Sequence, residues 1–209
     1  MTRYRPLALR TARSTLPLAA AALLVACAEA QVPNRDAQIA EAVQAAPMAQ
    51  RDDATIYGFH ADGTMVTIRE GTNGLICRSD DPTREGWEVA CYHESIEPFM
   101  ARGRELRAEG VTEAGELQQR RWAEADAGTL AMPEAPATLY VLTGDGFDAA
   151  SGTVQNSYLR WVIYTPYATA EETGLATQPG APGSPWLMFP GTAGAHIMIM
   201  PSPPPGSGA

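Results

Sequence analysis

Two cysteines and a histidine lie close together in the segment GLICRSDDPTREGWEVACYHES, residues 74–95: Cys77, Cys91 and His93. Thiolates and imidazole nitrogens bind zinc, and paired cysteines can also carry redox chemistry or form a structural disulfide. A structural zinc site usually contains a C-x-x-C pair, whereas Cys91 and His93 form only a C-x-H pair. The spacing therefore argues against a metal site, and the sequence predicts no cofactor.

The N-terminal segment MTRYRPLALRTARSTLPLAAAALLVACAEAQ is typical of a secretory signal. Residues 3–13 contain four arginines and no acid, and residues 14–26 form an uncharged run rich in Leu and Ala. A membrane-spanning helix needs roughly 20 apolar residues, and this run is shorter. We therefore predict an exported protein rather than one held by a permanent transmembrane helix.

The end of this segment, LVAC at residues 24–27, resembles the lipobox of bacterial lipoproteins. In that family the cysteine is acylated and becomes the mature N-terminus. The resemblance implies a signal peptide over residues 1–27, cut before Cys27, and a lipid anchor on that residue. Ala28, which stands where an Asp would imply inner-membrane retention, implies the outer membrane. Ordinary cleavage at the small residues of 26–30 is the alternative, and it would give a periplasmic or extracellular protein.

Export also decides the interpretation of the two remaining cysteines. With Cys27 lipidated or removed, Cys77 and Cys91 are an even pair in an oxidising compartment, which predicts a disulfide. The polar segment between them would form a loop of about 15 residues, and its closure is worth roughly 3 kcal/mol. We expect Cys77 to end a strand and Cys91 to lead into a helix near Ser95, so that the bond pins this helix to the sheet.

Charge and composition exclude several functions. Removal of residues 1–26 would take four of the 15 basic residues and no acid, which leaves 11 basic residues against 24 acidic ones. This balance argues against nucleic-acid binding and against electrostatic attachment to anionic lipid. Every basic residue is an arginine. The lack of lysine excludes Schiff-base, phosphate-loop and Ser-Lys mechanisms, which all use a lysine amine.

Periodicity and capping signals predict three helices. The first begins at the potential N-cap Asn34 and ends before Pro47, with apolar residues along one face. The second begins at Ser95 and ends at Gly110, and the third follows Thr112.

The remaining apolar segments predict strands. Residues 54–79 are expected to form a three-strand meander, because ADG and GTNG turn signals interrupt their apolar alternation. Four further strands are expected in the last third, in TLYVLTG, SYLRWVIYT, PWLMF and AHIMIM. This order of elements predicts an α+β fold, with a mostly antiparallel sheet and two or three helices.

The predicted organisation has a single folded domain over residues 51–200. Residues 28–50 are expected to form an N-terminal linker and helix, and residues 201–209 a disordered tail of Pro, Ser and Gly.

Two histidines are the candidates for catalysis. His93 and Glu94 place a base beside a carboxylate at the start of a helix, and His196 follows the Gly-rich turn FPGTAG. If the side chains of His93 and His196 lie further apart than about 10 Å, they are too distant to share one reacting centre, and the enzyme hypothesis loses its only constellation. The alternative interpretation places His93 in a polar loop and makes His196 a hydrogen-bonded residue at a strand edge.

The sequence therefore favours a non-catalytic, exported cell-envelope protein, lipid-anchored or periplasmic, that binds an unidentified protein or small molecule. An exported enzyme that uses His93, Glu94 and His196 is the alternative.

Overall fold

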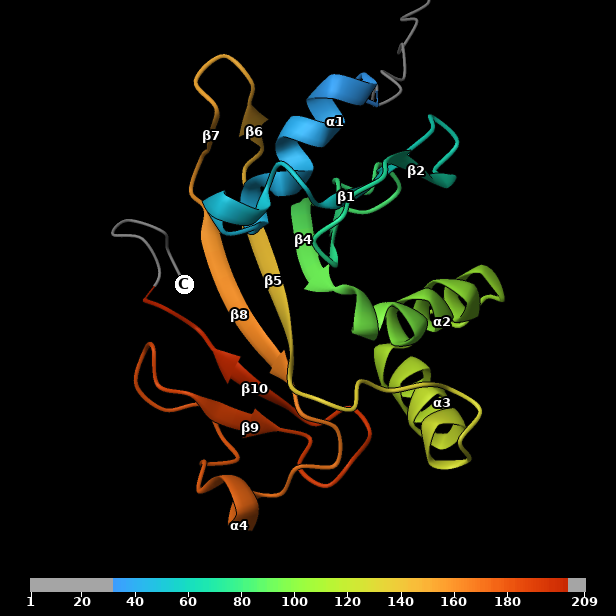
Figure 1. Cartoon of the computed structure of the whole chain (residues 1–209), viewed down its shortest axis with the longest axis vertical. Coiled ribbons are helices and arrows are strands. Elements are labelled where there is room, and N and C mark those ends of the chain that lie inside the picture. The colour runs from blue at the N-terminus through green and yellow to red at the C-terminus, as the bar shows by residue number, and fades with distance from the viewer. Residues whose placement is uncertain (1–31, 203–209) are drawn as a thin grey trace, which may run out of the picture. The chain divides into compact units, whose positions relative to one another are not determined.

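An eight-stranded, mostly antiparallel sheet organises the chain in a computed structural model that describes residues 32–202 (Figure 1). Only the β1–β3 pair is parallel among the strand pairs of this sheet. The strands, in their order across the sheet, are β2 (Met65–Arg69), β1 (Thr55–Phe59), β3 (Leu75–Arg78), β4 (Trp87–His93), β5 (Ala137–Gly144), β8 (Tyr158–Tyr164), β10 (His196–Ile199) and β9 (Trp186–Met188).

The helices confirm the predicted α+β class, and a short hairpin extends the β5–β8 connection. The hairpin strands are β6 (Phe147–Asp148) and β7 (Thr153–Val154). The helices are α1 (Arg35–Ala42), α2 (Glu97–Ala108), α3 (Ala114–Asp126) and the single-turn α4 (Ala170–Thr173), with 3-10 turns η1 (Val43–Ala45), η2 (Met48–Gln50) and η3 (Glu94–Ile96).

The helix boundaries follow from local capping chemistry. The Asn34 side chain accepts a hydrogen bond from the Ala37 amide at 3.0 Å, which confirms the predicted N-cap of α1. After α2, Gly110 has a φ of 94°, a left-handed conformation that favours glycine and ends the helix.

The two faces of the sheet pack against different helices. On one face, α1 and η1 contribute Ala42 and Ala45 to the same buried cluster as Ile56 and Leu75. A buried Gln38 fixes α1 there, because its amide donates to the Phe59 carbonyl and accepts from the Phe59 amide. On the other face, α2 and α3 cover a second cluster that includes Tyr92, Phe99 and Tyr164 (Figure 1).

Two predictions about the strands were wrong. Residues 54–79 are not a meander, because β1 lies between β2 and β3 and runs parallel to β3. In addition, the segment expected to be a loop between the cysteines contains the start of β4, a central strand paired with both β3 and β5. Its alternation in WEVACYH is strand-like, but the charged turn before it concealed the signal.

The predicted signal peptide with Cys27 and the tail from residue 203 onward lie outside the described residues. Within residues 32–202, no helix combines the length and the apolar character needed to cross a membrane.

Candidate functional site

The predicted disulfide between Cys77 and Cys91 is present, and both residues are fully buried. They occupy facing positions on β3 and β4, with their Cα atoms 4.0 Å apart. The bond therefore links neighbouring strands, and the expectation that it pins a helix to the sheet was wrong. The reason is that Cys91 lies inside a strand, two residues before its end, rather than at the entry to a helix.

His93 ends β4 and caps the turn that follows. Its Nδ1 lies 2.8 Å from the Ser95 hydroxyl oxygen and accepts a hydrogen bond from the Ser95 backbone amide at 3.2 Å. The exposed ring borders a recess of about 550 Å³, whose other wall is residues 132–138. Glu94 is the next residue and is also exposed.

His196 is buried at the start of β10. Its Nδ1 lies 2.7 Å from the Gly194 carbonyl oxygen, so this nitrogen carries the proton and donates. The rings of Tyr164 and Phe189 pack against the imidazole, and burial lowers the pKa of His196.

The structure does not bring His93 and His196 together. Two strands, β5 and β8, separate β4 from β10, which places the histidine backbones roughly 14 Å apart at about 4.8 Å per strand step. Strand pairing also puts His196 on the face of Tyr164 and Tyr92, and His93 is the residue after Tyr92. Because side chains alternate along a strand, the two imidazoles face opposite sides of the sheet.

A larger recess lies on the face of Tyr92, and we call it the α2 cleft. It has a volume of about 700 Å³ and lies between α2, the β1–β2 hairpin, strands β4 and β5, and the loop before β4. Its floor is largely apolar, and its rim carries four arginines. The principal floor residues are Phe59, Met65, Tyr92, Met100, Leu139 and Val141, and the arginines are Arg78, Arg84, Arg104 and Arg107.

Arg104 is neutralised by a neighbouring carboxylate. It forms an ion pair with Glu97, which also accepts hydrogen bonds from Tyr57 and Tyr92. The guanidinium carbon lies 5.8 Å from the centre of the Tyr57 ring. Arg104 thus lines the cleft with its charge already balanced.

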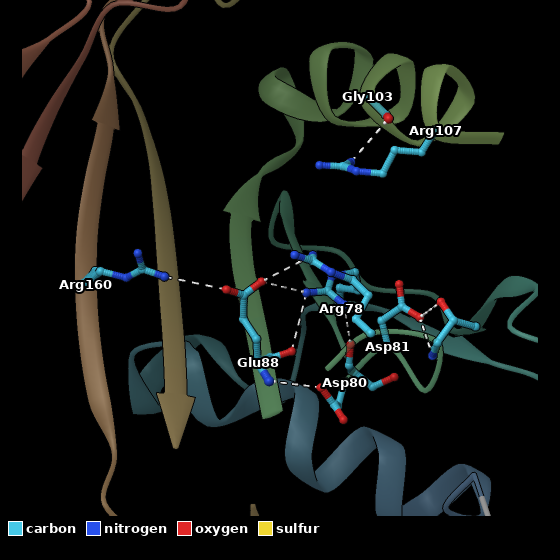
Figure 2. A network of polar contacts seen from close by, with 10 residues as sticks. Arg78, Asp80, Asp81, Glu88, Gly103, Arg107 and Arg160 are labelled. Carbon is cyan, nitrogen blue, oxygen red and sulfur yellow. Dashed lines mark hydrogen bonds and ion pairs between the residues drawn. The ribbon is translucent and has the colours of Figure 1, made fainter. Parts of the chain in front are cut away.

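Around Glu88, guanidinium groups outnumber carboxylates. The Glu88 carboxylate forms ion pairs with three arginines: Arg78 at 3.3 Å, Arg160 at 3.5 Å and Arg84 at 3.8 Å. Figure 2 shows its carboxylate between Arg160 on one side and Arg78 on the other. The Glu88 carboxylate balances only one of these three positive charges, and Asp80 and Asp81 supply further negative charge near Arg78.

Arg107 adds a fourth guanidinium near the three that surround Glu88. Its Nη1 donates to the Gly103 carbonyl at 3.2 Å, and no carboxylate within residues 32–202 forms an ion pair with it. In Figure 2 its side chain extends beneath α2 on the side of Arg78, and both residues border the cleft. Desolvation is the main cause that lowers the pKa of Arg107; the charges of Arg84 and Arg78 lower it further, and the charge of Asp81 opposes them.

Asp81 is the other acid on the cleft lining, and its turn already uses one of its oxygens. Its Oδ1 accepts hydrogen bonds from the Thr83 amide and hydroxyl. Hydrogen bonds from these neutral donors leave the negative charge of Asp81 in place, and Asp80 adds a third carboxylate near Arg78. The guanidinium groups therefore outnumber the carboxylates by one, in a chain whose net charge is −9.

These arginines were not among the sequence candidates. Arg104 and Arg107 are three residues apart on α2 and so share a helix face. This spacing was the one feature of the sequence that could have indicated a cluster of arginines. Arg78 and Arg84 lie in the segment interpreted as a loop, and only the pairing of β3 with β4 places them opposite α2.

No cluster of three or more His, Cys, Asp or Glu suited to a metal ion occurs in the part of the chain that the structure describes. A comparison of the chain with protein-family models, curated proteins and solved structures found no match.

Proposed function

We propose that the protein is an exported, non-catalytic binding domain of the cell envelope, and that its ligand occupies the α2 cleft. The observation that carries this proposal is the cleft itself, about 700 Å³ in volume, with an apolar floor and convergent polar groups at its rim. Ligand sites in proteins typically have volumes of about 300–1,000 Å³ and the same mixture of apolar walls and few polar groups.

Export is supported by the signal-like N-terminus and by the buried Cys77–Cys91 disulfide. Disulfides persist in oxidising compartments such as the periplasm and are rare in reducing ones. The lipobox resemblance at Cys27 adds a lipid anchor to the proposal, with the outer membrane as its destination. The alternative, an enzyme that uses His93, Glu94 and His196, gains no support from the geometry, because the two imidazoles face opposite sides of the sheet.

An uncharged fluorescent probe tests whether the cleft binds a ligand. N-phenylnaphthylamine should bind the purified protein saturably with one site per chain, seen as a rise in its fluorescence. The protein should carry Cys27→Ala, so that no lipid chain of its own competes for the cleft. Val141→Trp fills the cleft floor and should abolish this binding.

Ile163→Trp is the matched control. Ile163 is a half-buried aliphatic residue of the neighbouring strand β8, and it faces the other side of the sheet. This variant should bind the probe like the parent protein. The proposal fails if the parent shows no saturable binding, or if the two tryptophan variants bind the probe equally well.

A further inference from the structure

We infer that the ligand of the α2 cleft is a small anionic amphiphile, with a carboxylate or phosphate group at Arg84 and Arg107 and an aliphatic body on the cleft floor. This inference rests on the proposed function, and it adds the chemical class of the ligand.

Guanidinium groups outnumber carboxylates beside the cleft. Arg78, Arg84 and Arg160 share the carboxylate of Glu88, and Arg107 donates only to a backbone carbonyl. Asp80 and Asp81 add two negative charges near Arg78, which leaves four guanidinium groups against three carboxylates. Like charges held together cost free energy in the empty cleft, and a bound anion removes that cost. The planar fork of a guanidinium also matches a carboxylate or phosphate with two parallel hydrogen bonds.

The four arginines that line the cleft differ in exposure and in the contacts that they already make, and Arg104 is paired with Glu97. The Arg78 side chain is only 13% exposed and donates to the carbonyls of Ser79 and Glu88, so it holds the loop before β4 in place. Arg84 is 56% exposed, and its contact with Glu88 is the longest of the three, at 3.8 Å. Arg84 and Arg107 are therefore the two guanidinium groups that an incoming anion can reach.

The apolar floor of the cleft favours an aliphatic body for the ligand. Leu139 and Val141 lie on the floor beside the arginines, and Met65 and Met100 border the same cleft. Thioether side chains are flexible and adapt to irregular aliphatic surfaces. A bare inorganic anion would leave this apolar surface in contact with water, whereas an amphiphile covers it.

The overall charge sets a limit on the size of the anionic part. Acids outnumber basic residues by 24 to 15, so a long polyanion would meet net negative charge beyond the cleft. A single head group close to Arg84 and Arg107 avoids that repulsion, and this favours a small amphiphile over a nucleic acid.

Displacement of N-phenylnaphthylamine by decanoate, decyl phosphate and decanol tests the inference, since the three share a chain and differ in the head group. Both anions should displace the probe at concentrations roughly tenfold or more below that of decanol, because charge-assisted hydrogen bonds are stronger than neutral ones. The order of decanoate and decyl phosphate then identifies the preferred head group, and either order supports the inference.

Arg107→Gln should weaken displacement by the anions roughly tenfold or more and leave decanol unchanged. Arg120→Gln, on the exposed surface of α3, is the matched control and should behave like the parent. Arg107→Lys keeps the charge but loses the fork, and it should give an intermediate loss.

Three results would overturn the inference: decanol displacing the probe as well as the anions do, Arg107→Gln and Arg120→Gln having the same effect, or Arg107→Lys losing as much as Arg107→Gln. In these cases the probe still binds, so the proposed function stands. If N-phenylnaphthylamine does not bind the parent protein at all, both proposals fail.

Discussion

The buried carboxyl of Glu41 should make the folded protein less stable as the pH rises from about 4.5 to about 7. Glu41 lies on α1, is 6% exposed, and accepts a hydrogen bond from the Asp80 amide at 3.3 Å. Burial raises its pKa from 4.5 to about 7, against the opposing effects of a hydrogen bond from Trp87 and the charge of Arg78. The folded protein therefore holds this proton at pH values where the unfolded chain has released it.

The sign and size of the effect follow from proton linkage. Between pH 4.5 and about 7 the folded state binds more protons than the unfolded state, so the free energy of unfolding falls as the pH rises. A pKa of about 7 instead of 4.5 corresponds to a loss of at most about 3 kcal/mol, complete above pH 7. Glu41→Gln removes this titration while it keeps the size and the hydrogen-bonding oxygen of the side chain.

Urea unfolding at pH 5 and at pH 8, followed by tryptophan fluorescence, measures the difference between the variant and the parent. At pH 8 we expect Glu41→Gln to be more stable than the parent by up to about 3 kcal/mol, with most of the gain absent at pH 5. Glu134→Gln, at an exposed position, is the control and should show no such pH dependence. A gain that is equal at the two pH values, or a loss at pH 8, would refute the argument from burial.

Three further predictions test other parts of the protein. Cys77→Ser, Cys91→Ser and the double variant should each lose about 3 kcal/mol, because one bond is lost in all three, and titration of the unreduced, denatured parent should find no thiol from either position. Gly194→Ala should lower the melting temperature, because a Cβ at this position would overlap the indole of Trp122 on α3. A Cβ at Gly115 would meet no neighbouring atom, so Gly115→Ala should raise the melting temperature slightly. Cys27→Ala should move the protein from the membrane fraction to the soluble fraction, and unchanged fractionation would argue against lipidation.

The sequence predicted those elements whose signals are local. Asn34 and Gly110 mark helix boundaries through their own capping chemistry, so neighbouring residues sufficed to place them. The disulfide was predicted from a cysteine count and an export signal, which need no knowledge of the fold. The parallel β1–β3 pair was missed, because which strands become neighbours is decided by packing between distant segments rather than by turn residues.

The candidate site was missed for a related reason. The histidines were the sequence candidates for a site, whereas the α2 cleft is lined by arginines and apolar residues from elements far apart along the chain. Each arginine alone has the character of an ordinary surface residue. Only the sheet order brings the loop after β3 and the last turn of α2 to the same cleft.

The ion pairs of another arginine on α2, Arg102, provide a comparison for the arginines of the cleft. Arg102, also on α2, is surrounded by three carboxylates, Glu105, Glu109 and Glu124, at 3.1, 2.9 and 2.8 Å. That arrangement joins α2 to α3, and it has the excess of acid expected for an acidic chain. At Glu88 the proportion is inverted, with three guanidinium groups around one carboxylate. With Asp80 and Asp81 counted, four guanidinium groups still face three carboxylates in a chain with 24 acids, and this excess is the charge that the inferred anionic ligand would balance.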